Sequence, residues 1–280
     1  MSLLEKVKEL NNFSDKRKFV NLICCNDHVG LVHRKITNLI LKSKLPYYTE
    51  NNNLIFKEKK KNQLNLTLKN TCEVLLENNI LKEVTGEYFP CVRSLGKKEY
   101  FVLERALVEY LGIRGYGVHL VAYVKNKYNI KLWIPLRAKN KRVEPNKLDN
   151  TVAGGVAAGE STFHALLREG YEEASLGKTI LSKAVQVGTL NYIWRNKELS
   201  LRRDTLFVFE LELSKNITPQ NTDGEVTKFR LYDEKKILEK IQKTNEFKKN
   251  CALVLASFFI RRGLINSENE KNYEEICRKL

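Results

Sequence analysis

The chain has 280 residues, of which 42% are hydrophobic, and its formal net charge is +16. A chain of this length and composition can bury one large core or two modest ones, so a folded globular protein is expected. No stretch approaches the roughly 20 apolar residues of a membrane span. The first residues mix charges with apolar positions, unlike a secretory signal, and we expect the protein to stay in the cytoplasm.

The charge and the cysteines restrict the classes of partner. The six cysteines are scattered without CxxC pairs or nearby histidines, so neither a zinc site nor a disulfide framework is indicated. A charge of +16 would suit a phosphorylated metabolite or a nucleic acid. Basic residues are spread along the whole chain, however, and no basic stripe interleaved with aromatic residues is present. We therefore do not expect nucleic acid as the partner.

The first hundred residues carry the spacing of amphipathic helices. Apolar residues recur three and four positions apart, which places them on one face of a helix. Residues 88–92 form a short stretch with strand character, and we predict an α+β unit over residues 1–112. Helices are predicted over residues 3–10, 34–44, 63–79 and 101–112.

From Gly112 onward the sequence changes to strand-forming residues. Residues 115–124 and 128–137 are rich in β-branched and aromatic side chains, and the polar residues between them suit a hairpin. Strands around an inserted helix, with terminal helices covering the sheet, predict an α/β sandwich. The further predicted elements are strands over 151–156, 184–194 and 204–213, a helix over 161–174, and closing helices over 229–265 that meet near Thr244 and Asn245.

The inserted helix concentrates carboxylates. Glu169 lies three and four positions before Glu172 and Glu173, so the three share one face. Gly170 lies among them, although glycine inside a helix costs about 1 kcal/mol relative to alanine. Clustered carboxylates are the oxygen ligands that Mg²⁺ requires, whereas a solvated acidic face is the simpler interpretation. Gly170 would be explained if the helix packs closely against a strand.

The spacing around this helix favours the metal site. The residues that form the pattern G-x5-E-x7-R-E-x2-E-E are Gly154, Glu160, Arg168, Glu169, Glu172 and Glu173. The pattern resembles the Nudix box, G-x5-E-x7-R-E-U-x-E-E-x-G-U, in which U is a bulky aliphatic residue. Two positions depart from it, since Gly170 replaces the bulky residue and Ser175 replaces the last glycine.

The resemblance extends over nearly the whole chain. The segments GYGVHLVAYV, LDNTVAGGVAAGES, EEASL and FKKNCALVLASFFIRRGLI together look like the Nudix family related to thiamine pyrophosphokinase. In that family a small N-terminal domain of unassigned chemistry precedes the Nudix domain. The resemblance implies a Nudix α/β/α sandwich with a mixed sheet over residues 113–280, preceded by an α+β domain over residues 1–112. The family often carries a small residue and EEAS at the two departing positions.

The resemblance also implies roles for single residues. The implied ligands of Mg²⁺ or Mn²⁺ are Glu169, Glu172 and Glu173. Arg168 and Glu172 would belong to the catalytic set, with Glu160 pairing with Arg168 to hold the surrounding loops. Many Nudix enzymes use a further carboxylate on a later loop, and Glu225 is our candidate to orient or deprotonate the attacking water. A turn residue that is merely exposed is the alternative for Glu225.

Substrate contacts are predicted from residue type alone. Arg137, Lys139 and Lys141 lie near the end of a predicted strand and are candidates to bind phosphate. Trp194 or Tyr192 is a candidate to stack on a heteroaromatic ring. Structural or exposed roles are the alternative for each of these side chains.

The function implied by the resemblance is Mg²⁺-dependent hydrolysis of thiamine diphosphate or altered forms of it. One alternative is a Nudix hydrolase of ADP-ribose or other nucleoside diphosphate derivatives. Another is a Nudix module that binds a ligand or nucleic acid without turnover, although clustered glutamates argue against lost catalysis. The Nudix resemblance also covers isopentenyl-diphosphate isomerases, whose chemistry uses a cysteine near the pocket. That activity is disfavoured here, because no cysteine lies between Cys91 and Cys251. The sequence does not indicate the oligomeric state.

Overall fold

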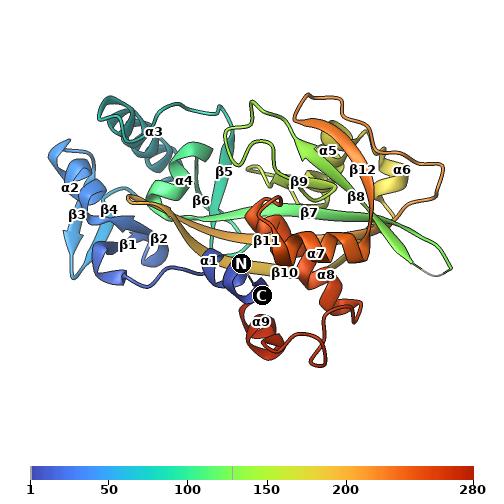
Figure 1. Cartoon of the computed structure of the whole chain (residues 1–280). Coiled ribbons are helices and arrows are strands. Elements are labelled where there is room, and N and C mark those ends of the chain that lie inside the picture. The colour runs from blue at the N-terminus through green and yellow to red at the C-terminus, as the bar shows by residue number, and fades with distance from the viewer. Residues whose placement is uncertain (1, 128) are drawn as a thin grey trace.

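A computed structural model describes residues 2–127 and 129–280 and shows two main sheets, each flanked by helices (Figure 1). The predicted mixed α/β class with an α+β N-terminal part is confirmed. Among the described residues, no helix is long and apolar enough to cross a bilayer. All six cysteines are free thiols, in agreement with the sequence.

The N-terminal part is built on a four-stranded sheet with the order β2-β1-β4-β3. Its strands are β1 (Phe19–Cys24), β2 (Asp27–His33), β3 (Tyr47–Glu50) and β4 (Asn53–Phe56). β1 pairs parallel with β4 and antiparallel with β2. The helices α2 (Arg34–Lys42) and α3 (Lys61–Glu77) bury their apolar faces with this sheet in one core, as the helical spacing predicts.

The predicted helix over residues 101–112 is wrong in its first part. Residues Glu99–Glu104 form strand β6, which pairs with β5 (Tyr88–Val92), and the helix α4 spans only Arg105–Leu111. Glu104 ends the strand and caps the helix, because its carboxylate accepts a hydrogen bond from the backbone N–H of Ala106 at 3.3 Å. Cross-strand pairing with β5 therefore overrides the local helical spacing.

The C-terminal part is built on a six-stranded mixed sheet with the order β10-β11-β7-β8-β12, in which β9 also pairs with β7. Its strands are β7 (Arg114–Lys125), β8 (Ile130–Arg137), β9 (Val152–Gly155), β10 (Val185–Lys197), β11 (Ser200–Glu212) and β12 (Val226–Asp233). β7 and β11 are parallel neighbours, and the other pairs are antiparallel. β7 is buried on both faces, which explains its continuous apolar sequence.

Helices cover both faces of this sheet. One face packs against α5 (Thr162–Ala174) and the short α6 (Lys178–Leu181). The other face packs against α8 (Lys249–Arg261), with α7 (Glu234–Lys243) and α9 (Tyr273–Lys279) in the same layer (Figure 1). Alternate residues of β7 serve the two cores, as the strand period of two requires.

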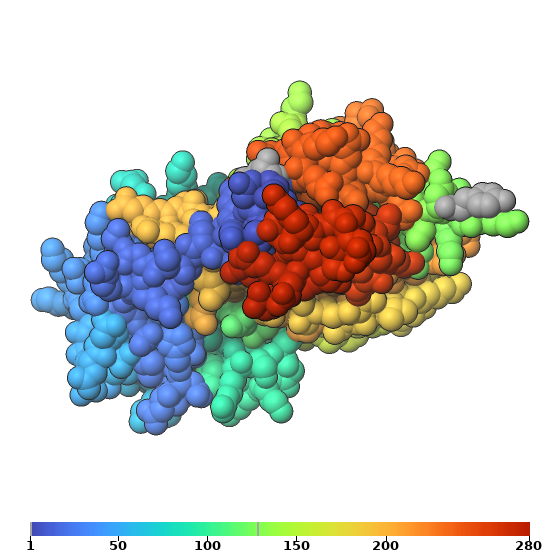
Figure 2. Space-filling model, turned by 60° about the horizontal axis from the view of Figure 1, so that its bottom comes forward, coloured from blue at the N-terminus to red at the C-terminus, as the bar shows by residue number. Residues whose placement is uncertain are grey.

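The first helix belongs to this second layer. α1 (Leu3–Leu10) packs against α8 and α9, and its buried leucines join the core of the six-stranded sheet. Figure 2 shows this blue segment lying against the red C-terminal helices. The division of the chain at residues 112 and 113 stays a prediction, with the qualification that α1 packs in the C-terminal core.

The closing helical region differs from the prediction at its start. Residues 229–233 belong to strand β12, which pairs antiparallel with β8, so the helices begin only at Glu234. The predicted break near Thr244 and Asn245 is confirmed, since α7 ends at Lys243.

Candidate active site

The acidic helix α5 is closed at both ends by serines. The hydroxyl of Ser161 accepts a hydrogen bond from the backbone N–H of His164 at 3.1 Å. Ser175 has the left-handed conformation, with φ of 54°, and the N–H of Leu176 bonds to the Gly170 carbonyl at 3.0 Å. Helix C-termini of this kind favour glycine. The position where the Nudix pattern has glycine therefore keeps its glycine-like backbone here with a serine.

Gly170 is buried, as the packing hypothesis predicts. A Cβ at this position would lie 2.7 Å from Leu181 Cδ1, closer than van der Waals contact allows. The neighbour is therefore the short helix α6 and not a strand, which corrects the predicted contact. Leu166 and Ala174 are fully buried against the sheet, so α5 packs on the sheet through the face that carries them.

Arg168 organises the loop before the helix. Its guanidinium forms two hydrogen bonds with Glu160, at 2.7 and 3.0 Å, and one with the carbonyl of Gly155 at 3.0 Å. The same group contacts Glu169 at 2.8 Å and Glu172 at 3.3 Å. The pair expected between Glu160 and Arg168 is present, and Arg168 acts as the common counter-charge of three glutamates.

Glu169 lies directly over a glycine of strand β9. A Cβ on Gly154 would lie only 1.9 Å from Glu169 Cδ, so the carboxyl group fills the space that a side chain would take. Burial raises the pKa of Glu169, while Arg168 acts in the opposite direction. Gly154 is thus required at this position because it makes room for a buried acid.

Glu173 is the most buried acid of the helix, with 6% of its surface exposed. One carboxylate oxygen accepts a hydrogen bond from the backbone N–H of Ala153 at 2.8 Å. Burial, followed by the negative charge of Glu169, raises the pKa of Glu173 to about 8. Within the described chain no basic side chain forms an ion pair with Glu173. Two buried acids therefore share one region, and Arg168 pairs with one of them, Glu169.

The predicted loop carboxylate lies beside this region. Glu225 forms an ion pair with Lys141, and its negative charge also contributes to the raised pKa of Glu169 and Glu173. Glu172 is half exposed and bonded to Arg168. In the described part of the chain, no three acidic, histidine or cysteine side chains meet in the arrangement of a metal site; Arg168 holds two of the three glutamates of α5.

Arg137 and Trp194 have structural partners. Arg137 is buried and bonds to Asp149 Oδ2 at 2.6 Å and to the carbonyls of Val143 and Glu144. Trp194 is partly buried against the core, and Lys249 Nζ lies 4.9 Å from its ring centroid. These contacts occupy both side chains, while Lys141 is held by Glu225.

Tyr192 is also buried, and its hydroxyl donates to Asp204 at 2.5 Å. The phenol is therefore held in the core under α8. The burial of Tyr192 argues against the predicted role of its ring in stacking on a substrate.

A buried polar cluster next to the acidic helix escapes sequence reasoning. Asp149 accepts hydrogen bonds from Arg137 and from the thiol of Cys251, and Lys248 Nζ lies 3.6 Å away. These cations hold the pKa of Asp149 well below its usual range despite its burial. His119 bonds to Asn150 at 2.7 Å, and burial lowers its pKa to about 4. The segments GYGVHLVAYV, LDN and FKKNCALV, quoted for the resemblance, contain these residues apart from Arg137, but nothing in the sequence indicated that they meet.

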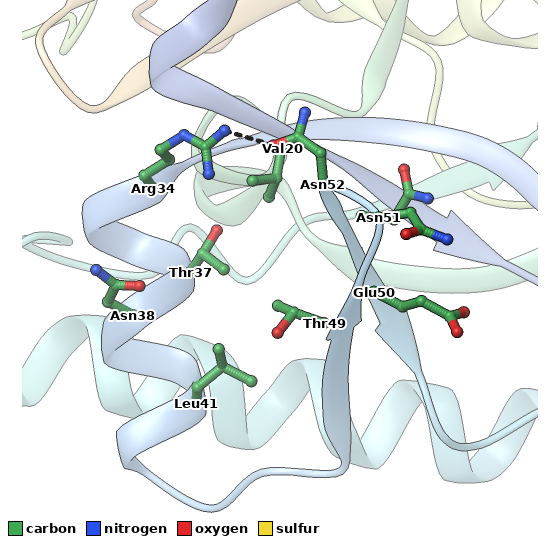
Figure 3. Close-up of a pocket in the computed structure, with 10 residues that line it drawn as sticks. Val20, Arg34, Thr37, Asn38, Leu41, Thr49, Glu50, Asn51 and Asn52 are labelled. Carbon is green, nitrogen blue, oxygen red and sulfur yellow. Dashed lines mark hydrogen bonds between the residues drawn. The ribbon is translucent and has the colours of Figure 1, made fainter.

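The N-terminal sheet carries a separate cavity of about 430 Å³ between α2 and the turn of β3 and β4 (Figure 3). Its lining is mostly neutral and polar, and Arg34 bonds to Asn52 across one end. None of the predicted site residues lines this cavity. The chemistry predicted from the sequence therefore belongs to the acidic helix and its surroundings.

Comparison with known proteins agrees with this placement. A family model described as NUDIX domain matches residues 117–252, and one described as Domain of unknown function (DUF4743) matches residues 2–115. Nudix hydrolase 20, chloroplastic, from Arabidopsis thaliana is 31% identical over 99% of this chain and 76% of its own length. An uncharacterized protein of Saccharomyces cerevisiae is 35% identical over 66% of this chain and 58% of its own.

Solved structures are more distant. The MutT protein from Methanosarcina mazei is 17% identical, with a TM-score of 0.42, and covers 53% of this chain and 95% of that one. The similarity to the plant enzyme over 99% of this chain and the family match that includes the acidic helix carry the assignment. The chain belongs to the Nudix family of pyrophosphohydrolases, with an N-terminal domain of unknown function.

Proposed function

We propose that this Nudix hydrolase uses Mg²⁺ or Mn²⁺ held by Glu169, Glu172 and Glu173. The observation that carries the proposal is the burial of Glu169 and Glu173 side by side, with the pKa of both groups raised. Two buried acids repel each other and lose hydration when they ionise. A bound divalent cation would offset both the repulsion and the loss of hydration, and this would explain why two acids are buried together.

The residues present fit a hard cation. All three donors are carboxylates, which Mg²⁺ prefers, and Gly154 leaves the space that Glu169 occupies. Glu173 has one oxygen bonded to a backbone N–H and the other without a basic partner. When bound, the ion supplies charge neutralisation for a diphosphate and activation of water. Glu169 and Glu172 would exchange their contacts with Arg168 for contacts with the ion.

The remaining residues of the site would position the carboxylates or assist the attack of water. Arg168 would keep its two hydrogen bonds to Glu160 and so hold the loop before the helix in place beside the three carboxylates that would hold the ion. Glu225 is the proposed acceptor of a proton from the attacking water, and its ion pair with Lys141 would orient its carboxylate. Lys141 has a partly exposed side chain and pairs with Glu225 beside the acidic helix. We propose that it binds a substrate phosphate.

The proposed substrates are thiamine diphosphate and altered forms of it. The support is the resemblance of the quoted segments to the thiamine pyrophosphokinase-related family together with the match along 99% of the chain to a Nudix hydrolase. Trp194 is the proposed stacking partner of the heteroaromatic ring, once Lys249 moves from its face. Residence in the cytoplasm also remains a proposal, since the names of two plant relatives carry the word chloroplastic.

A panel of diphosphates, assayed with Mg²⁺ and with excess EDTA, tests the proposal. We expect phosphate release from thiamine diphosphate or altered forms of it, and none with EDTA. Turnover of ADP-ribose, with no release from any thiamine-type compound, would replace the proposed substrate with the nucleoside diphosphate class. Hydrolysis that persists in EDTA would remove the metal from the account.

A further inference from the structure

Two arginines face each other where the N-terminal part meets the six-stranded sheet. Arg114 begins β7, Arg203 lies on β11, and the two are direct partners in the parallel pairing of these strands. Their side chains therefore leave the same face of the sheet, about 5 Å apart at their bases. Like charges in this relation repel each other.

Neither guanidinium has an acidic partner. Arg114 donates to the side-chain oxygens of Thr205 and Asn191, at 2.8 and 3.3 Å, and Arg203 donates to the carbonyl of Gly112 at 3.1 Å. All three acceptors are neutral. Throughout residues 2–127 and 129–280, no carboxylate lies within ion-pair distance of either arginine. The nitrogen Nε of Arg203 is buried without any hydrogen-bond acceptor.

Most other partly buried arginines of the described chain are compensated. Four of them pair with at least one carboxylate, namely Arg137 with Asp149, Arg168 with Glu160, Arg202 with Asp204, and Arg262 with Glu210. Arg195, the exception, is a single arginine that donates to the backbone carbonyl of Glu198. Arg114 and Arg203 differ from these arginines because they lie next to each other and, among the described residues, neither has a carboxylate as a partner.

The surroundings increase this imbalance. Burial and the charge of Arg114 lower the pKa of Arg203. Burial, together with the charge of Arg203, lowers the pKa of His28 on β2. β2 and β11 contact each other at this junction (Figure 1). The side chains of His28, Arg114 and Arg203 therefore lie in one region where no carboxylate of the described residues pairs with either arginine.

We infer that Arg114 and Arg203 bind a phosphate group of a small metabolite at the junction of the two parts. Two guanidinium groups side by side offer several N–H donors to one tetrahedral oxyanion, and the bound charge removes their repulsion. The Thr205 hydroxyl, already bonded to Asn191, lies next to this pair. The site is separate from the acidic helix, since neither arginine bonds to any residue of α5.

Thermal unfolding of the full chain in EDTA tests the inference, with inorganic phosphate compared with sodium chloride at equal ionic strength. Phosphate should raise the melting temperature of the wild type above that in chloride, because a ligand of the folded state stabilises it. Arg203→Gln and the double variant with Arg114→Gln should lose this shift, with the apparent Kd raised about tenfold or more. Arg203→Lys should retain part of it.

Controls separate the site from general charge and from the acidic site. Arg17→Gln removes one charge from a side chain that is 97% exposed and should keep the phosphate shift. Glu173→Gln should keep it too, whatever it does to hydrolysis. In chloride, Arg203→Gln should melt no lower than the wild type, because it relieves a repulsion, whereas a purely structural arginine would give a lower melting temperature. A phosphate shift that survives in the double variant, or is absent from the wild type, would overturn the inference.

Discussion

Replacing Gly154 with alanine tests how the acidic site is assembled. The new Cβ would lie 1.9 Å from Glu169 Cδ and 2.1 Å from its Oε1, whereas non-bonded carbon atoms keep about 3.5 Å. The Glu169 carboxyl must therefore move by about 1.5 Å. A displacement of about 1 Å at a reacting site can lower the rate about 100-fold, so we expect kcat/KM to fall by about that factor or more. Overpacking should also reduce the free energy of unfolding, by about 1–3 kcal/mol.

The assay compares phosphate release and urea unfolding for Gly154→Ala and a matched control. Gly177 precedes helix α6 with φ of −72°, and a Cβ there meets nothing within 4 Å. Gly177→Ala should therefore change neither activity nor stability by more than a small amount. If Gly154→Ala keeps kcat/KM within about threefold of the wild type, the position of Glu169 does not matter for hydrolysis and our reasoning about this glycine is refuted.

Three further substitutions test single interactions. Ser175→Gly should raise the free energy of unfolding by about 0.5–1 kcal/mol in urea without changing hydrolysis, because it relieves a left-handed backbone; a loss of stability would contradict this. His119 is buried with its pKa lowered to about 4, so stability should fall as the pH drops from 6.5 to 4, by up to about 3 kcal/mol. His119→Gln should flatten that fall, and an unchanged pH profile would refute the assignment. Arg137→Met should cost about 3–5 kcal/mol, since Asp149 stays buried and keeps, among the described residues, Lys248 alone as an ion-pair partner, whereas a raised KM at unchanged stability would indicate a substrate contact.

The parts of the fold that the sequence predicts are those with strong local signals. The hairpin of β7 and β8 follows from two strand-forming runs around polar residues, and α5 follows from the spacing of its residues. The sequence does not predict the four-stranded sheet, because its strands have only four to seven residues and the pair that joins its two halves, β1 with β4, spans the intervening helix α2. β6 was read as helix because its apolar spacing fits either period over so few residues.

The candidate site divides in the same way. Glu160, Arg168 and the three glutamates lie within one loop and one helix, so their spacing could reveal them. Asp149, Cys251 and His119 come from three separate elements, up to 132 positions apart, and only tertiary structure brings them together. Arg137 was expected to meet phosphate because its type and position suit that role, but its partner Asp149 could not be recognised from the sequence.

The central claim is tested most directly by the Mg²⁺-dependent hydrolysis rate of Glu173→Gln. Glutamine has the same shape and can keep the hydrogen bond from Ala153, while it removes the charge that would bind the ion. The account predicts that Mg²⁺ no longer stimulates diphosphate hydrolysis, that the rate falls by at least about 100-fold, and that the melting temperature in EDTA is no lower than that of the wild type. A variant that hydrolyses the same diphosphate at the wild-type rate, with the same dependence on Mg²⁺, would contradict it.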